Sequence, residues 1–279
     1  MSKLIGREAE IQAFTKYEQS GKPEFVAVYG RRRVGKTFLV KNFFEDRICF
    51  NASGTFGDPR ETQLENFALE LSGRTGEKPS KLEDWTEAFW QLEQYIKQLP
   101  DSNKRKVIFL DELPWFDTQK SGFTRALDYF WNHFLSTRSD CMLVVCGSAT
   151  SWMVNNLIND KGGLHNRITH EIHLRPFTLR EVESYMKNAG FNWNRLVILQ
   201  TYMILGGIPY YLDMLDKDET FPTNIDNMMF AGNAPLRNEF KRLYDSLFGR
   251  SEKYRAVISA LSTSKKGLTR KEIADKLKL

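Results

Sequence analysis

Residues 29–39 read YGRRRVGKTFL, and within this stretch residues 30–37 match the pattern G-x-x-x-x-G-K-[ST] at every position. Loops of this pattern (Walker A loops) wrap backbone amides around the β-phosphate of a nucleotide. An apolar run, residues 25–29, precedes the loop, and a helical pattern over residues 38–44 follows it. Because a strand and a helix frame the loop, the N-terminus of that helix can face an anion. The stretch therefore predicts a phosphate site in an α/β protein.

Each position of the loop has an expected role. Gly30 and Gly35 stand where a side chain would collide with the phosphate or where φ must be unusual. Lys36 supplies a positive charge to the β- and γ-phosphates, and the Thr37 hydroxyl binds Mg²⁺. The positions between them contribute mainly backbone amides. The predicted nucleotide contacts of this segment are Gly30, Arg31, Arg32, Arg33, Val34, Gly35, Lys36, Thr37 and Phe38.

A second motif, KVIFLDELPWF at residues 106–116, delivers two carboxylates to the carboxyl end of a buried strand. Ligands of open α/β sheets bind at that end of the strands. We expect Asp111 to hold Mg²⁺ through its water shell and Glu112 to orient and polarise the attacking water. By itself the motif also fits a strand that ends in a solvated acidic turn. The glycine-rich loop favours a Walker B motif, because a nucleotide phosphate needs a carrier for its counter-ion.

Strand-like and helix-like segments alternate through the first 175 residues. Five short apolar runs fit strands that are buried on both faces of a parallel sheet, namely residues 25–29, 47–51, 107–110, 142–146 and 168–174. Residues 58–71 predict a helix with Asp58 as its cap and Pro59 at its first position. Thr178 and Glu181 form a capping box. The alternation predicts a doubly wound α/β domain over residues 1–175.

No further strand is evident after Leu174. We expect residues 176–248 to form a helical lid with breaks at residues 189–194, 206–209 and 221–224. Residues 249–279 read as a helix, a turn and a second helix that Thr269 and Glu272 cap. This order resembles the opening of a winged-helix or helix-turn-helix domain. We expect that domain to be truncated or completed elsewhere, because the chain stops before a recognition helix.

Five stretches together resemble the archaeal-type AAA+/STAND P-loop ATPases, which are also widespread in bacteria: YGRRRVGKT, VIFLDELPW, VVCGSATSWM, NRITHEIHLRPFTLREV and GGIPYYL. The resemblance covers roughly residues 1–250, with the motifs in the expected order. It implies a five-stranded ASCE core with the phosphate-loop strand in the middle and the acidic strand beside it. It also implies a helical lid, a winged helix and, in many members, a C-terminal nuclease-like domain that we expect this chain to lack.

The resemblance adds residues around the base of the nucleotide. In LIGREAEI, it puts Ile5, Gly6 and Arg7 near the adenine or the ribose, although the same residues fit an ordinary amphipathic helix start. Pro209 in GGIPYYL matches the lid position that packs on the base in signalling ATPases. Without the family, Pro209 reads as a helix break.

Two residues are assigned to the γ-phosphate by the same resemblance. Ser148 follows the fourth strand, where related ATPases carry a polar sensor, commonly Asn; the alternative is a capping serine. Arg167 resembles the arginine that stabilises transition-state charge, often in a neighbouring subunit; the alternative is a surface arginine. With these, the predicted catalytic residues are Lys36, Glu112, Ser148 and Arg167.

The net charge of +5 is concentrated in the tail, because residues 237–279 hold 12 Lys and Arg against 5 Asp and Glu. A basic helix-turn-helix segment of this kind can bind nucleic acid, and winged helices also serve as rigid connectors to a protein partner. The rest of the chain is close to neutral. We therefore expect the side chains of Arg31, Arg32 and Arg33 to reach the lid, the acidic body or a neighbouring subunit rather than nucleic acid.

No apolar run approaches the roughly 20 residues that span a bilayer, and the N-terminus lacks the features of a signal peptide. We expect a cytoplasmic protein with no membrane partner and with Cys49, Cys141 and Cys146 as buried, reduced thiols. The favoured function is a switch that binds ATP and ADP, uses Mg²⁺, hydrolyses ATP slowly and can form a homo-oligomer. The alternative is a regulatory module that binds nucleic acid through the basic C-terminal segment.

Overall fold

The computed structural model describes residues 4–101, 104–149, 152–158, 167–239 and 251–277. Backbone contacts divide the chain into two compact units, Met1–Asp213 and Met214–Leu279. The first unit contains the sheet together with the first helices of the expected lid. The division between the two units, after Asp213, thus lies between the domain boundaries that the sequence predicts at residues 175 and 248.

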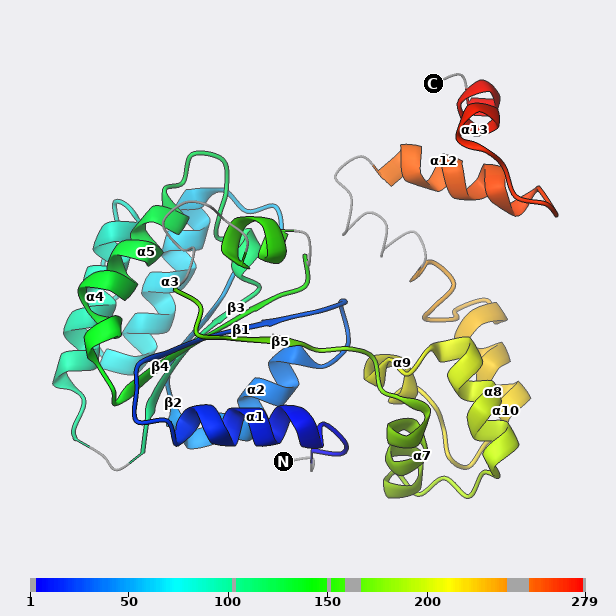
Figure 1. Ribbon diagram of the computed structural model, residues 1–279, viewed down its shortest axis with the longest axis horizontal. Helices are drawn as coiled ribbons and strands as arrows, with labels where there is room; N and C mark the ends of the chain where they lie inside the picture. Colours follow the sequence, from blue (N-terminus) through cyan, green and yellow to red (C-terminus); the bar gives the residue numbers. More distant parts are fainter. Residues whose placement is uncertain (1–3, 102–103, 150–151, 159–166, 240–250, 278–279) are drawn as a thin grey trace. The chain divides into compact units, whose positions relative to one another are not determined.

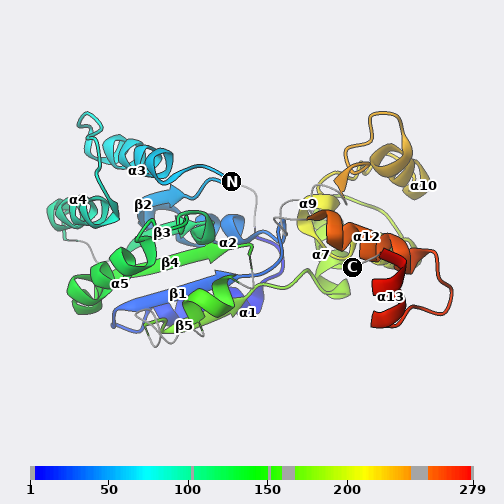
Figure 2. The ribbon, with the colours of Figure 1, turned by 90° about the horizontal axis from the view of Figure 1, so that it is seen from above.

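Five parallel strands form the sheet of the first unit, in the order β2-β3-β4-β1-β5 (Figures 1 and 2). The strands are β1 (Glu24–Tyr29), β2 (Ile48–Ser53), β3 (Lys106–Asp111), β4 (Cys141–Gly147) and β5 (His170–His173). They correspond to the five predicted runs, which confirms the doubly wound α/β fold. The expected positions of two strands were wrong, because β4 is in the middle and separates the acidic strand β3 from the phosphate-loop strand β1. The motifs identify which strands carry them but contain no information about strand pairing.

Helices cover both faces of the sheet (Figure 1). α1 (Glu8–Glu18) and α2 (Lys36–Phe44) bury Phe14, Leu39 and Phe44 against one face. The other face is covered by α3 (Arg60–Thr75), α4 (Trp85–Gln98) and α5 (Phe123–His133). Alternate residues of β1 enter the two cores, since Phe25 and Ala27 belong to one and Val26 and Val28 to the other. This double burial explains why the strands read as continuous apolar runs.

Short helical turns connect these elements: the 3-10 turns η1 (Glu45–Arg47), η2 (Leu113–Trp115) and η3 (Leu135–Thr137), and the π-helical turn η4 (Met153–Ile158). After β5 come α7 (Leu179–Asn188), α8 (Arg195–Leu205) and α9 (Pro209–Leu212) in the first unit. The second unit contains α10 (Phe221–Ile225), the π-helical turn η5 (Asp226–Phe230), α12 (Ser251–Ser262) and α13 (Arg270–Leu277). The capping box of Thr178 and Glu181 is present, and Thr269 and Glu272 make the same pair of contacts before α13.

Two local predictions were wrong. Asp58 does not cap α3, which begins at Arg60 with Pro59 at its N-cap and no side-chain cap. Instead the Gln63 amide ties down the preceding loop, because its Nε2 donates to the Thr55 carbonyl at 2.6 Å and its Oε1 accepts from the Thr55 amide at 3.1 Å. Residues 221–224 are not a break but the start of α10, where a proline in the first turn is tolerated.

In the described part of the chain, no helix combines the length and the apolar character needed to cross a membrane. The three cysteines are free thiols; Cys141 and Cys146 are buried and Cys49 is half-buried. Burial raises the pKa of Cys49 to about 11 and that of Cys141 to about 12, so both are neutral thiols at physiological pH.

Candidate functional site

The loop between β1 and α2 is closely packed at its first glycine and open at its second. A Cβ added at Gly30 would lie 2.2 Å from the carbonyl oxygen of Leu174, so only glycine fits. Gly35, the N-cap of α2, has a φ of 91°, and no described atom lies within 4 Å of a Cβ added there. The first glycine permits close packing against the segment after β5, and the second keeps the face of the loop accessible in front of the α2 N-terminus.

Lys36 lies at the first position of α2 and is only 5 % exposed. Its Nζ donates hydrogen bonds to the carbonyl oxygens of Gly30 and Arg31, each at 3.1 Å. Burial lowers the pKa of Lys36, and the carboxylates of Glu112 and Asp111 oppose this effect. The ammonium is thus held across the loop by two backbone oxygens.

Thr37 and Asp111 meet where the start of α2 faces the end of β3. The Thr37 hydroxyl donates to Asp111 Oδ2 at 2.7 Å, and the amide of Glu112 donates to Asp111 Oδ1 at 3.0 Å. Desolvation raises the pKa of Asp111, while the hydrogen bond from Thr37 opposes the increase. A hydroxyl and a carboxylate are the oxygen ligands that Mg²⁺ prefers, so this pair fits the ion that the sequence predicts.

Glu112 follows β3 in a left-handed conformation, with a φ of 47° and a ψ of 47°. Its Oε2 accepts two hydrogen bonds from Ser148, one from the hydroxyl at 2.7 Å and one from the backbone amide at 3.1 Å. The sequence assigned these residues separate roles, and the structure brings their side chains into direct contact. The contact depends on β3 and β4 being neighbours in the sheet, which the sequence motifs do not reveal.

A pocket of about 600 Å³ lies in the first unit beside the loop. Predicted residues that line it are Ile5, Arg7, Arg33, Val34, Gly35, Lys36, Thr37, Phe38, Glu112 and Pro209. Predicted residues outside its lining are Gly6, Gly30, Arg31, Arg32, Asp111, Ser148 and Arg167. Lining residues that the sequence did not predict are Leu4, Leu39, Phe177, Tyr185, Asn188, Ala189, Tyr210 and Asp213. The pocket therefore has a phosphate-binding end at the loop and a mainly apolar, aromatic end formed by the N-terminal segment and helices α7 and α9.

Arg7 connects three parts of this pocket. Its guanidinium donates to the carbonyl oxygens of Arg175 at 2.7 Å and Val34 at 2.9 Å, and it lies 4.5 Å from the centre of the Phe177 ring. The backbone amide of Arg7 donates to Glu181 Oε1 at 3.2 Å. Burial lowers the pKa of Arg7, against the effect of Glu10 and Glu181. The residue predicted beside the base thus also joins the phosphate loop to the segment that leads into α7.

Among the three loop arginines, Arg33 contacts α9. Its guanidinium carbon lies 4.3 Å from the centre of the Tyr210 ring and 5.7 Å from that of Tyr211, and Pro209 begins the same helix. This contact meets the expectation that these side chains reach the lid. Arg31 and Arg32 are exposed.

Arg167 lies at the opposite end of the sheet from the loop. The neighbouring Thr169 donates its amide to the carbonyl of Phe25, at the start of β1, whereas Gly30 follows the end of β1. Five residues of strand correspond to roughly 16 Å. Arg167 Nε lies 3.6 Å from Asp128 Oδ1 of α5. Within one chain this arginine is far from the phosphate loop, so only the intersubunit form of its predicted role is compatible with the fold.

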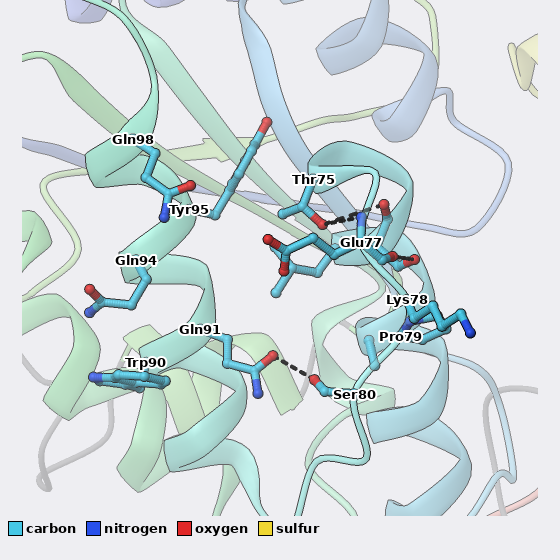
Figure 3. Close-up of a pocket in the computed structure, with 13 residues that line it drawn as sticks. Thr75, Glu77, Lys78, Pro79, Ser80, Trp90, Gln91, Gln94, Tyr95 and Gln98 are labelled. Carbon is cyan, nitrogen blue, oxygen red and sulfur yellow. Dashed lines mark hydrogen bonds between the residues drawn. The ribbon is translucent and has the colours of Figure 1, made fainter.

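A second pocket, of about 280 Å³, lies beside helices α3 and α4 (Figure 3). Glutamine side chains of α4 line one side of it, and the Ser80 hydroxyl donates to Gln91 Oε1 at 2.8 Å. It contains none of the predicted site residues and no glycine-rich loop. The pocket beside the Walker A loop is therefore the candidate nucleotide site.

A glycine-rich loop at the start of a helix, an acidic strand end beside it and the strand order β2-β3-β4-β1-β5 define a P-loop ATPase fold. Residues 4–215 match the model of a family described as an ATPase domain predominantly from Archaea, and the chain belongs to that family.

Known proteins are similar over most of this chain. The uncharacterized protein MJECL04 of Methanocaldococcus jannaschii is 27 % identical over 263 residues, which are 93 % of this chain and 54 % of that protein. This chain thus spans about half the length of that relative. The Walker-type ATPase PABY2304 of Pyrococcus abyssi shares the fold with a TM-score of 0.66 at 17 % identity, covering 99 % of this chain and 88 % of that one. The ORC2 protein of Aeropyrum pernix, solved as ADPNP–ADP complexes, has a TM-score of 0.50 at 16 % identity, with coverages of 77 % and 58 %.

Proposed function

We propose that this chain is a nucleotide-dependent switch that binds MgATP and hydrolyses it slowly. The observation that carries the proposal is the gathering of Lys36, Thr37 and Glu112 at one end of a pocket of about 600 Å³. The pair of Thr37 and Asp111 adds a carboxylate at the same place. Membership in a family of ATPase domains supports ATP as the substrate.

In this proposal the loop amides and Lys36 bind the phosphates, and the apolar end of the pocket, with Ile5 and Pro209, receives the base. Thr37 and Asp111 would hold Mg²⁺, which would supply positive charge to the phosphates of the nucleotide. Glu112 accepts a proton from the attacking water while the water oxygen forms a bond to the γ-phosphorus. The bond between the γ-phosphorus and the bridging oxygen breaks, and that oxygen leaves with ADP. The structural neighbour solved with ADPNP and ADP supports binding of both nucleotide states.

The switch follows from the contacts between the phosphate loop and the helices after β5. Arg7 and Arg33 join the loop to Phe177 and Tyr210. A nucleotide in the pocket would contact both the phosphate loop and the helices after β5. It would shift the equilibrium between two arrangements of the loop and these helices if it bound one arrangement more tightly than the other. The resemblance to signalling ATPases supports slow turnover.

The hydrolysis step is tested with Glu112→Gln, which keeps the size of the side chain and removes its basicity. We expect ATP binding to stay within about threefold of wild type and turnover to fall by 10²-fold or more, as for loss of a general base. Phosphate release in single-turnover reactions, with and without Mg²⁺, measures this effect. Undiminished turnover would remove Glu112 from the role of base.

A second candidate function is nucleic-acid binding by the tail. The tail carries a net charge of +7 over residues 237–279, and two short helices, α12 and α13, lie in this segment. Affinity for duplex DNA that falls steeply between 50 and 200 mM salt would support this function, because neutralised phosphates release counterions. Absence of binding at low salt would exclude it for this chain and favour a protein partner.

A further inference from the structure

The turn after β3 is held between two glycines on the neighbouring strands. A Cβ added at Gly54, just after β2, would lie 2.6 Å from the carbonyl oxygen of Glu112. A Cβ added at Gly147, at the end of β4, would lie 3.0 Å from Pro114 Cδ and 2.5 Å from Met153 Sδ. Both strands therefore approach the turn more closely than any larger residue allows. This packing fixes a glutamate in a left-handed conformation, which a non-glycine residue adopts only when its surroundings impose it.

The same packing places Ser148 against the Glu112 carboxylate. Ser148 is 8 % exposed, and both of its donors, the hydroxyl and the backbone amide, are directed to Glu112 Oε2. A serine hydroxyl has one proton to donate, and an amide has one. With both protons engaged on Oε2, Ser148 has no donor left for a γ-phosphate oxygen, which in the triphosphate is only an acceptor.

We propose that Ser148 is a positioning residue that acts through Glu112 and does not itself contact the γ-phosphate. Two hydrogen bonds anchor Oε2, and within the described residues no hydrogen bond to Oε1 is found. Oε1 is then the oxygen that orients water at the phosphate end of the pocket, which Glu112 lines. The role rests on the proposed hydrolysis and goes beyond it by assigning the group that sets the orientation of the base.

The test compares Ser148→Ala and Ser148→Thr in the full chain, each alone and combined with Glu112→Gln. Loss of the hydroxyl releases one of the two anchors, so we expect kcat to fall roughly tenfold, with KM for ATP and the ratio of ATP to ADP affinity unchanged within about twofold. Threonine keeps the hydroxyl and should restore most of kcat. In the Glu112→Gln background, Ser148→Ala should cause no further loss. Ser136→Ala, at a surface serine that donates to the carbonyl of Asn132, is the matched control and should leave kcat unchanged.

Three results would overturn the proposal. Selective weakening of ATP relative to ADP would make Ser148 a phosphate sensor. Additive losses in the double variant would separate Ser148 from Glu112, and an increased kcat would mean that Ser148 restrains the base. A second measurement is thermal unfolding, without nucleotide, of wild type, Ser148→Ala, Glu112→Gln and the variant that combines them; the changes in stability should be non-additive if the two side chains interact. If wild type binds ATP without turnover, the hydrolysis proposal and the role of Ser148 fail together, while the unfolding comparison still reports the contact.

Discussion

At the scale of single residues, Asp111 shows a conflict between stability and function. Asp111 is 6 % exposed at the end of a buried strand, and desolvation raises the pKa of its carboxyl group above the ordinary value of 3.8. The hydrogen bond from the Thr37 hydroxyl offsets only part of this effect. A buried carboxylate without a full set of partners is costly, and such residues concentrate at functional sites. A cation bound beside Asp111 would stabilise the ionised carboxylate and offset the cost of burying it.

This conflict predicts a pH dependence for Asp111→Asn. Because the folded-state pKa of Asp111 is raised, the folded chain holds the proton more tightly than the unfolded chain. Asp111 therefore favours folding least when it is ionised, at a pH above its folded-state pKa. We expect the free energy of unfolding of the variant, relative to wild type, to increase as pH rises from about 3.8 through that folded-state value. Urea unfolding at several pH values, with chelator present, measures the difference.

The control for this measurement is Asp218→Asn, at an exposed carboxyl group paired with Lys217. The free energy of unfolding of Asp218→Asn, relative to wild type, should change little over the same pH range. If the difference in free energy of unfolding between Asp111→Asn and wild type does not change with pH, the pKa of Asp111 is not raised in the folded chain.

At the scale of elements, two arginines join the phosphate loop to the helices after β5. Arg7 reaches Phe177 and the carbonyl of Arg175, and Arg33 stacks on Tyr210 of α9. Neither contact needs a phosphate. Arg33 is therefore the arginine of the loop that connects it to the lid, and phosphate binding is expected to depend on the backbone of the loop and on Lys36.

This connection predicts separate effects on binding and on lid dynamics for Arg33→Gln. We expect ATP affinity to stay within about threefold of wild type, while amide exchange in Pro209–Leu212 becomes roughly two- to fivefold faster, as for loss of a cation–π contact of about 0.5–1 kcal/mol. Hydrogen exchange by mass spectrometry measures the second effect, with Arg32→Gln as the matched control. A tenfold loss of ATP affinity in Arg33→Gln would show that the side chain holds phosphate.

The sequence predicts local features of these elements well and their arrangement poorly. The five strands, the Walker A loop and the capping box at Thr178 depend on short-range patterns, and each has the predicted form. The order of β1, β4 and β3, and the contact of Ser148 with Glu112, depend on strand pairing between distant segments. The sequence did not predict the aromatic end of the pocket, which includes Phe177 and Tyr185. These residues line the pocket because α7 packs beside the N-terminal segment, and that packing is not visible in the sequence.

At the scale of the whole molecule, the position of Arg167 raises the question of whether copies of this chain assemble and share their nucleotide sites. It lies near the start of β5 with Asp128 as its ion-pair partner, at the end of the sheet opposite the phosphate loop. Only the pocket of another copy could receive its charge at a γ-phosphate.

This arrangement predicts complementation between two inactive variants. Lys36→Ala lacks a working pocket but retains the arginine, and Arg167→Ala retains the pocket but lacks the arginine. If copies share their sites, a mixture of the two should recover part of the wild-type turnover, and activity per chain should rise with protein concentration. Turnover of Arg167→Ala equal to wild type at all concentrations would reduce Arg167 to a surface residue paired with Asp128.

Calorimetric titration of ATP with Mg²⁺ measures whether nucleotide binds at the loop after β1 through Lys36. Lys36→Ala should weaken binding by about 10²-fold or more, because it removes the buried charge that we expect to bind the phosphates. Lys41→Ala, at an exposed lysine of the same helix, should bind as wild type does. Equal ATP affinity in wild type and Lys36→Ala would show that the loop after β1 is not the nucleotide site.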